Sequence, residues 1–153
     1  MKRQQRTVGA ILRIDLEDGY YNYAQILEFG VAFFDIHVKE AELESLDILL
    51  EKPILFIVEV YNDVITRGRW IKVGKLPIRE DLKILPMKFI QDALNPQFFE
   101  LYNPNTGEIT PSTREACEGL ERSAVWDSNH VEDRLRDYYA GRPCSWVESL
   151  KIK

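Results

Sequence analysis

Alternating apolar and polar residues near the start of the chain predict a β-hairpin. Every second residue is apolar over residues 12–16, and a second alternating run covers residues 20–28. Asp18-Gly19 lies between the runs and is typical of a type I′ turn, because that turn needs positive φ at both central residues. Tyr21 and Tyr23 share one face of the second strand. The hairpin therefore displays hydroxylated aromatic side chains, which suit a core that also meets a partner.

Two denser apolar segments predict the next strands. Val31–Ile36 is rich in strand-forming residues, and Ile54–Val60 is an almost continuous apolar run that we expect to be central and buried on both faces. Between them, leucines at helical spacing in Glu40–Leu50 predict a short helix or an irregular excursion whose glutamates face solvent. Arg69–Val73 predicts a further strand that ends at Gly74.

Turn-forming residues organise the middle of the chain. Prolines bracket residues 76–86, which we predict to be an exposed connector. The segment 103–107 contains Asn, Pro and Gly and predicts a hairpin turn between strands at 98–102 and 108–110.

The last forty residues have helical patterns. Ser112 or Thr113 can cap a helix over Arg114–Arg122. An apolar stripe predicts a second helix that starts near Asp127 or Ser128 and runs through His130–Tyr139, and Gly141 ends it. Strands followed by helices predict an α+β fold, in which a curved, mainly antiparallel sheet or small open β-barrel has the C-terminal helices packed on it.

The length of 153 residues favours one domain. We expect it to cover residues 1–153, with a strand-rich part at 7–111 and a helical part at 112–141. Trp70 and Trp126 are assigned to the core. Trp146 follows the last helix, and we expect it to clamp the C-terminus onto the sheet.

Composition restricts the class of protein. With 45% hydrophobic and 29% charged residues the chain is globular rather than disordered, and no apolar run is long enough to span a membrane as a helix. The basic N-terminus lacks the apolar segment of a signal peptide. Cys117 and Cys144 are far apart in the sequence. These features predict a reduced, cytoplasmic protein without a membrane partner.

The charges are unevenly distributed along the chain. Residues 14–63 contain twelve acidic residues and two lysines, a formal charge of −10. Residues 64–107 contain seven basic and four acidic residues, a formal charge of +3. We call the acidic residues of the segment 14–63 the acidic front. Such a concentration of negative charge repels phosphate backbones and steers basic protein partners. The alternative is that these acids pair with the basic segment once the chain folds.

Motifs of catalysis and metal binding are absent from the sequence. It has no H-x-x-x-H or C-x-x-C spacing, no G-x-S-x-G elbow, no P-loop and no dinucleotide fingerprint. His37 and His130 fall on different predicted elements. We therefore expect no catalytic site, no metal and no cofactor.

One segment supports a different function. Arg67, Arg69, Trp70 and Lys72 interleave bases with an aromatic residue, as in a sheet that binds single-stranded nucleic acid or acts as a regulatory binding module. The sequence pI of about 5.1 argues against nucleic acid as the partner.

An ordered set of motifs runs along nearly the whole chain. It begins with Asp18-Gly19-x-Tyr21-x-Tyr23 inside residues 9–27 and continues with Phe34-Asp35-Ile36, Leu55-Phe56, Gly68-Arg69-Trp70-x-x-x-Gly74, Leu76-Pro77 and a closing helix over residues 131–141. In this order the motifs resemble the immunity protein 26 family of bacterial polymorphic-toxin systems. The resemblance implies a non-enzymatic inhibitor that binds a cognate toxin domain, often a nuclease, inside the cell.

The acidic stretch and the tyrosine strand together predict the partner-binding surface. Nucleases that grip phosphate are basic, so an acidic face accelerates their association, and tyrosines are good anchors. For each tyrosine the alternative is core packing. The predicted surface comprises Glu17, Asp18, Tyr21, Tyr23, Asp35, Glu40, Glu42, Glu44 and Asp47.

Overall fold

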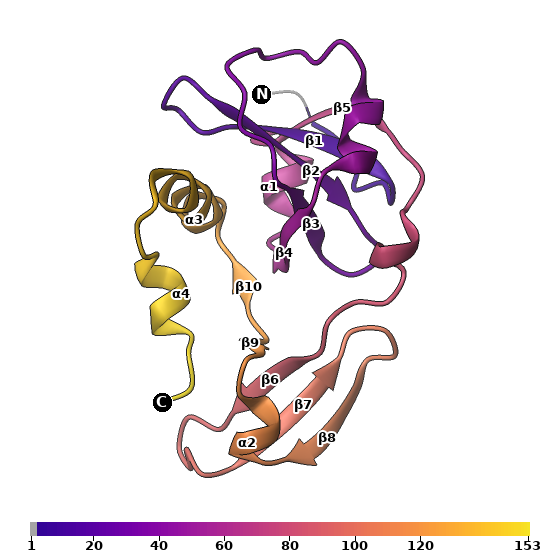
Figure 1. Ribbon diagram of the computed structural model, residues 1–153. Coiled ribbons are helices and arrows are strands. Elements are labelled where there is room, and N and C mark those ends of the chain that lie inside the picture. The colour runs from indigo at the N-terminus through magenta and orange to yellow at the C-terminus, as the bar shows by residue number, and fades with distance from the viewer. Residues whose placement is uncertain (1–2) are drawn as a thin grey trace.

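Six strands form the larger of two β-sheets in the computed structural model, which describes residues 3–153 (Figure 1). The strand order is β10-β4-β3-β2-β1-β5. All neighbours are antiparallel except β10, which pairs in parallel with the end of β4. The strands are β1 (Ala10–Asp15), β2 (Tyr21–Ile26), β3 (Val31–Phe34), β4 (Ile54–Val60), β5 (Ile71–Lys75) and β10 (Val125–Trp126).

The loop of the first hairpin differs from the prediction. Positive φ angles occur at Glu17 and Gly19 rather than at Asp18-Gly19, so the type I′ turn is wrong. The N–H of Glu17 donates to the Asp15 carboxylate, and the N–H of Tyr20 donates to the Asp18 carboxylate. These local hydrogen bonds stabilise a wider loop between the strands.

The smaller sheet contains four strands in the order β8-β7-β6-β9. Its predicted hairpin is confirmed, because Asn103 pairs with Glu108 at the turn. The two other strands were not predicted, and β9 and β10 lie in the stretch 112–141 where the sequence predicts helices. The strands are β6 (Lys88–Gln91), β7 (Phe99–Asn103), β8 (Glu108–Ser112) and β9 (Glu121–Arg122).

The helices are short apart from one. The helix predicted over Arg114–Arg122 is wrong in length, since the chain leaves it after the buried Cys117, turns at Gly119 with positive φ, and pairs as β9 with β6. The helix predicted over His130–Tyr139 is confirmed. The helices are α1 (Asp63–Thr66), α2 (Arg114–Cys117), α3 (Ser128–Ala140), α4 (Ser145–Ser149) and the 3-10 helices η1 (Leu46–Glu51) and η2 (Glu80–Leu82).

Each face of the larger sheet has its own core. On one face Leu12 and Ile14 pack with Trp70, Val131 and Leu135, so α3 covers this side. The opposite face is covered by the segment 39–52 and by the connector 76–86. The α+β class is thereby confirmed, with open sheets rather than a closed barrel.

Two predictions about this opposite face are wrong. In β4 only alternate residues are fully buried, among them Phe56 and Val58, because the connector covers the other face incompletely. The connector itself is not fully exposed, since Leu82 and Leu85 are buried against the sheet.

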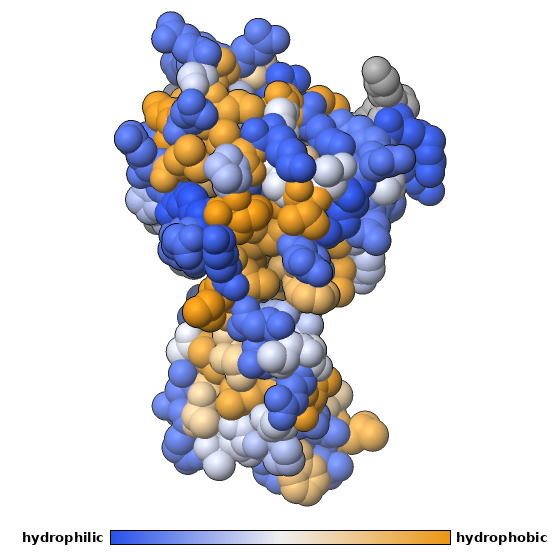
Figure 2. All heavy atoms as spheres, turned by 90° about the vertical axis from the view of Figure 1, so that its right-hand side faces the viewer, coloured by the Kyte–Doolittle hydropathy of each residue, from blue (hydrophilic) through white to orange (hydrophobic). Residues whose placement is uncertain are grey.

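The two sheets are joined at a waist, which Figure 2 shows between a larger upper body and a smaller lower one. The smaller sheet has a separate core of Phe89, Phe99 and Cys117. Across the waist, the Lys88 amine donates to the carbonyl oxygen of Ile57 at 2.8 Å. No helix within residues 3–153 is long and apolar enough to cross a membrane.

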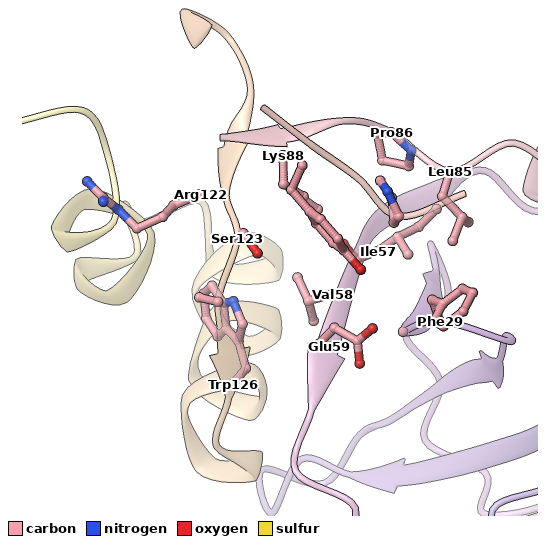
Figure 3. Close-up of a pocket in the computed structure, with 14 residues that line it drawn as sticks. Phe29, Ile57, Val58, Glu59, Leu85, Pro86, Lys88, Arg122, Ser123 and Trp126 are labelled. Carbon is pink, nitrogen blue, oxygen red and sulfur yellow. The ribbon is translucent and has the colours of Figure 1, made fainter. Parts of the chain in front are cut away.

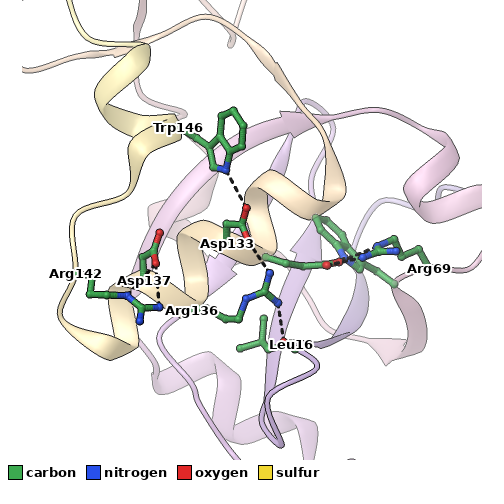
Figure 4. Close-up of polar contacts among 9 residues, drawn as sticks. Leu16, Arg69, Asp133, Arg136, Asp137, Arg142 and Trp146 are labelled. Atoms are coloured by element: carbon green, nitrogen blue, oxygen red, sulfur yellow. Dashed lines mark hydrogen bonds and ion pairs between the residues drawn. The ribbon is translucent and has the colours of Figure 1, made fainter.

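The C-terminal helix packs on α3 rather than on the sheet alone. The Trp146 indole donates to the Asp133 carboxylate at 2.9 Å (Figure 4). The same ring stacks on His130. Val147 and Leu150 pack against the core of the α3 face. Trp146 therefore holds α4 against α3, which corrects the expectation that it clamps the sheet.

Candidate functional site

Four predicted site residues lie together on one exposed loop. Glu40, Glu42, Glu44 and Asp47 are all exposed, and we call residues 40–47 the acidic loop. The loop crosses the face of the larger sheet that α3 does not cover, and its last two residues, Leu46 and Asp47, form the start of η1 (Figure 1). Four carboxylates therefore face solvent within eight residues.

The larger sheet fixes the backbone of the acidic loop. Before the loop, Val38 pairs with Tyr21 through two backbone hydrogen bonds of 2.7 and 3.1 Å. Within it, the carbonyl oxygen of Ala41 accepts from the Arg13 guanidinium at 3.0 Å and from the Tyr23 hydroxyl at 2.8 Å. The loop carbonyl is thus bound by two side chains of the sheet.

Further contacts fix the end of the acidic loop. The Ser45 hydroxyl accepts from the N–H of Asp47 and so caps η1. Leu49, which the helical spacing did not single out, is fully buried in η1. The Arg79 guanidinium donates to the carbonyl oxygen of Lys52 at 2.5 Å, just after η1. The carboxylates are therefore presented on an ordered support.

The acids of residues 14–63 have no ion-pair partner among residues 3–153. Three of the seven cations in residues 64–107 pair with acids outside residues 14–63: Arg69 with Glu132, Arg79 with Asp81, and Lys83 with Glu80, each at 2.6 Å. The alternative that the acidic front is neutralised by the basic segment is therefore wrong. The charge of the acidic loop stays available to a partner.

The other predicted acids lie on elements that contact α3. Glu17 and Asp18 occupy the exposed β1–β2 loop, which the Arg136 guanidinium holds by donating to the Leu16 carbonyl oxygen at 2.6 Å (Figure 4). The Asp35 carboxylate accepts from the Tyr139 hydroxyl at 3.1 Å. The pKa of Tyr139 is raised above its ordinary value, mainly because the side chain is buried and secondly because of this hydrogen bond to Asp35. The predicted acids therefore form two groups, one on the acidic loop and one on elements that contact α3.

The two predicted tyrosines differ in exposure. Tyr21 is half-buried, and the Arg13 guanidinium carbon lies 5.8 Å from its ring centroid. Tyr23 is only 1% exposed, and burial raises the pKa of its hydroxyl. Tyr23 holds the backbone of the acidic loop through its hydrogen bond to Ala41, whereas part of the Tyr21 side chain remains exposed to solvent.

The basic and aromatic segment does not form the nucleic-acid face of the alternative prediction. Trp70 is fully buried, and its indole donates to the Glu132 carboxylate at 2.9 Å. Arg69 binds the same carboxylate through two hydrogen bonds, and the Lys72 amine donates to Thr7. A buried indole cannot stack on bases.

The histidines lie in aromatic stacks. His37 lies between Tyr20 and Tyr139, with ring centroids 3.9 and 4.2 Å away, and His130 stacks on Trp146 at 3.6 Å. Among the residues that the structure describes, no group of three or more His, Cys, Asp or Glu side chains is arranged to hold a metal ion.

A hollow at the waist was missed by the sequence. Figure 3 shows Phe29 and Leu85 on one side of it and Trp126 on the other, while Arg122 extends away toward α4. The hollow depends on the smaller sheet standing beside β4. Because two strands of that sheet carry no recognisable pattern, no sequence signal locates it.

The fold and the loop together define an acidic α+β protein with four exposed carboxylates that form no ion pair among residues 3–153. A family model described as Immunity protein 26 matches residues 7–100, more than half of the chain. The chain therefore belongs to the immunity protein 26 family, and the resemblance found in the sequence is confirmed. The match includes the whole acidic loop. No curated protein and no solved structure matches the chain.

Proposed function

We propose that this immunity protein binds a cognate toxin domain in the cytoplasm and neutralises it through the acidic loop. The observation that carries the proposal is the set of four exposed carboxylates without ion-pair partners among residues 3–153. Membership of an immunity protein family supports a toxin as the partner.

The electrostatics favour a basic partner. Uncompensated carboxylates attract a positively charged surface over about a Debye length, roughly 8–10 Å at ordinary salt. Such steering raises association rates by about 10-fold or more at low salt. The whole chain carries a formal charge of −5, which reinforces the attraction.

The ordered support of the loop favours tight binding. The side chains of Arg13 and Tyr23 already hold the loop backbone through Ala41. A preformed loop loses little conformational entropy when a partner binds. Inhibition by occupancy then needs no catalytic group in the immunity protein.

A nuclease domain fits this partner chemistry. Enzymes that act on nucleic acid place lysines and arginines where phosphates bind. An acidic loop that enters such a groove competes with the phosphates for the same cations. We therefore propose a nuclease as the toxin class and one-to-one binding as the mode of neutralisation.

A charge-reversal experiment tests the role of the loop. The triple variant Glu42→Lys/Glu44→Lys/Asp47→Lys should slow association with the toxin domain by about 10-fold or more at low salt, with a smaller effect at moderate salt. The matched control Glu108→Lys/Glu115→Lys/Glu118→Lys changes the net charge equally at exposed acids of the smaller body. Association rates are measured by biolayer interferometry. Equal effects of the two triples, or no effect of either, would remove the loop from the proposal.

A further inference from the structure

An apolar groove opens beside the waist, between the larger sheet and the turn of the β7–β8 hairpin. It has a volume of about 480 Å³ and is lined mainly by Val8, Phe29, Ile78, Leu85 and Pro104. This volume is within the range of sites that bind small molecules or single side chains of a partner. The surface in Figure 2 shows apolar side chains gathered over one side of the upper body and continuing to the waist.

The turn that carries Phe29 is held in place by its surroundings. Leu27 donates its N–H to the carbonyl oxygen of Gly30 at 3.0 Å. Gly30 has a φ of 85°, and a Cβ there would lie 3.1 Å from the Val58 carbonyl oxygen, so the turn favours glycine. The Arg6 guanidinium donates to the carbonyl oxygens of Leu27 and Gly30 at 2.8 and 3.3 Å.

The opposite wall is fixed as well. The side-chain amide of Asn105 accepts from the N–H of Leu85 at 2.6 Å and donates to its carbonyl oxygen at 2.9 Å. This pair of hydrogen bonds ties the β7–β8 turn to the connector. The groove is therefore preformed, and a ligand does not have to order its walls.

Large apolar side chains remain accessible at the groove. Phe29 is 45% exposed and Val8 is 42% exposed. Phe29 stands at the tip of a tight turn, where an aromatic side chain with few rotors can bury much area against a partner.

Two carboxylates without ion-pair partners lie near Phe29. Glu28, next to Phe29, is exposed and has no ion-pair partner among residues 3–153. Glu59 lines the adjoining hollow, as Figure 3 shows, and it also lacks an ion pair within the described chain. Cations also lie here: Lys83 lines the groove and pairs with Glu80 at 2.6 Å, and the Arg6 guanidinium is bound to the backbone carbonyls of the turn. Lys88 lines the hollow with Glu59. Glu28 is therefore the exposed carboxylate at the groove that a cation of a partner can reach.

From this geometry we infer that the groove binds an apolar side chain of the cognate toxin, flanked by a lysine or arginine that pairs with Glu28. The inference rests on the proposed function and names a second contact for the same partner. A second copy of this chain is disfavoured as the occupant, because each copy carries a net charge of −5 and like charges repel.

The connector links this groove to the acidic loop. Its Arg79 binds the carbonyl oxygen of Lys52 at the end of η1, and its Ile78 and Leu85 line the groove. The acidic loop accelerates association, whereas the groove buries apolar area and slows dissociation.

Substitutions at the groove test the inference with the toxin domain captured as partner. Phe29→Ala should weaken binding by about 10-fold or more, mainly through faster dissociation. Glu28→Lys, at an exposed position, should weaken binding and reduce its salt sensitivity. The control Ile109→Ala removes an apolar side chain that is 51% exposed on β8, and it should change the Kd by less than about twofold.

The outcomes separate this inference from the proposed function. If Phe29→Ala and Glu28→Lys both leave the Kd within twofold of wild type while the acidic-loop triple still slows association, the groove is not a contact and the proposed function stands. If light scattering shows a wild-type dimer that Phe29→Ala dissociates, a second copy occupies the groove and the inference is overturned. If the acidic-loop triple has no effect but Phe29→Ala does, the groove is confirmed and the acidic loop is not.

Discussion

Replacing Glu132 with alanine should destabilise the fold more than removing any other single ion pair on α3. Glu132 is 3% exposed and accepts three hydrogen bonds, two from Arg69 at 2.6 and 2.9 Å and one from the Trp70 indole at 2.9 Å. It joins α3 to the segment before β5. The position lies beyond residue 100, where the family match ends.

The loss in the free energy of unfolding follows from the groups that lose their hydrogen-bond partner. The fully buried Trp70 N–H would remain without an acceptor, which costs about 1–3 kcal/mol. Arg69 is 41% exposed, so water replaces much of its lost pairing, and this part amounts to about 1 kcal/mol or less. Together the expected loss is about 3 kcal/mol, or roughly 6–12 °C in Tm for a chain of this length.

A matched control lies on the same helix. Asp137 pairs with Arg142 at 3.2 Å, and the Arg142 side chain is 63% exposed, so Asp137→Ala should cost about 1 kcal/mol or less. Urea unfolding, followed by tryptophan fluorescence, measures both variants. If the two losses differ by less than about 1 kcal/mol, the reasoning about Glu132 is refuted. A large loss for Glu132→Ala would show that the family-matched segment needs α3 to close its core.

Two further stability predictions concern the C-terminal part. Truncation after Gly141 removes α4, including the contacts of Trp146 with Asp133 and His130, and should lower Tm; an unchanged Tm would remove α4 from the account. For Glu121, burial alone would raise the pKa, but the paired Arg134 guanidinium holds it below the ordinary value of 4.5. Because this folded-state pKa is depressed, the pair stabilises the fold above about pH 4.5, and the contribution is lost as pH falls through the folded value. The Tm difference between wild type and Glu121→Gln should therefore shrink from pH 6 to pH 3, and a constant difference would contradict the direction of the pKa.

The parts of the fold that the sequence predicted are those with local patterns. Both hairpins lie where the sequence predicted them. The first was located by the alternation of apolar and polar residues before Asp18, and the second by the turn residues at 103–107. Gly141, with a φ of 71°, ends α3 where the pattern predicted. In each case a short stretch of chain contains its own structural signal.

The errors arose where tertiary contacts overrode local propensity. Arg114–Arg122 has a helical composition, yet Glu121 and Arg122 pair with β6, and no local pattern indicates a strand of two residues. Leu82 and Leu85 lie between prolines and look exposed, but they cover the sheet. Trp146 lies against α3 because Asp133 offers a hydrogen-bond acceptor there, which spacing alone does not show.

The candidate site was predicted unevenly for the same reason. The acidic loop was found because its charge lies on one continuous segment. Glu17 and Asp18 were grouped with it because they are acidic and precede the tyrosine strand, although Arg136 of α3 holds their loop. Phe29 was not singled out, because its exposure depends on the packing of two sheets.

We propose that this immunity protein neutralises a protein toxin by binding it. The most direct test is a pull-down of the tagged chain from its host lysate at low and moderate salt, with co-expression of the captured partner. We predict one stoichiometric protein partner whose toxicity is relieved by the wild-type chain. Recovery of nucleic acid alone, lost steeply as salt is added, would contradict the account.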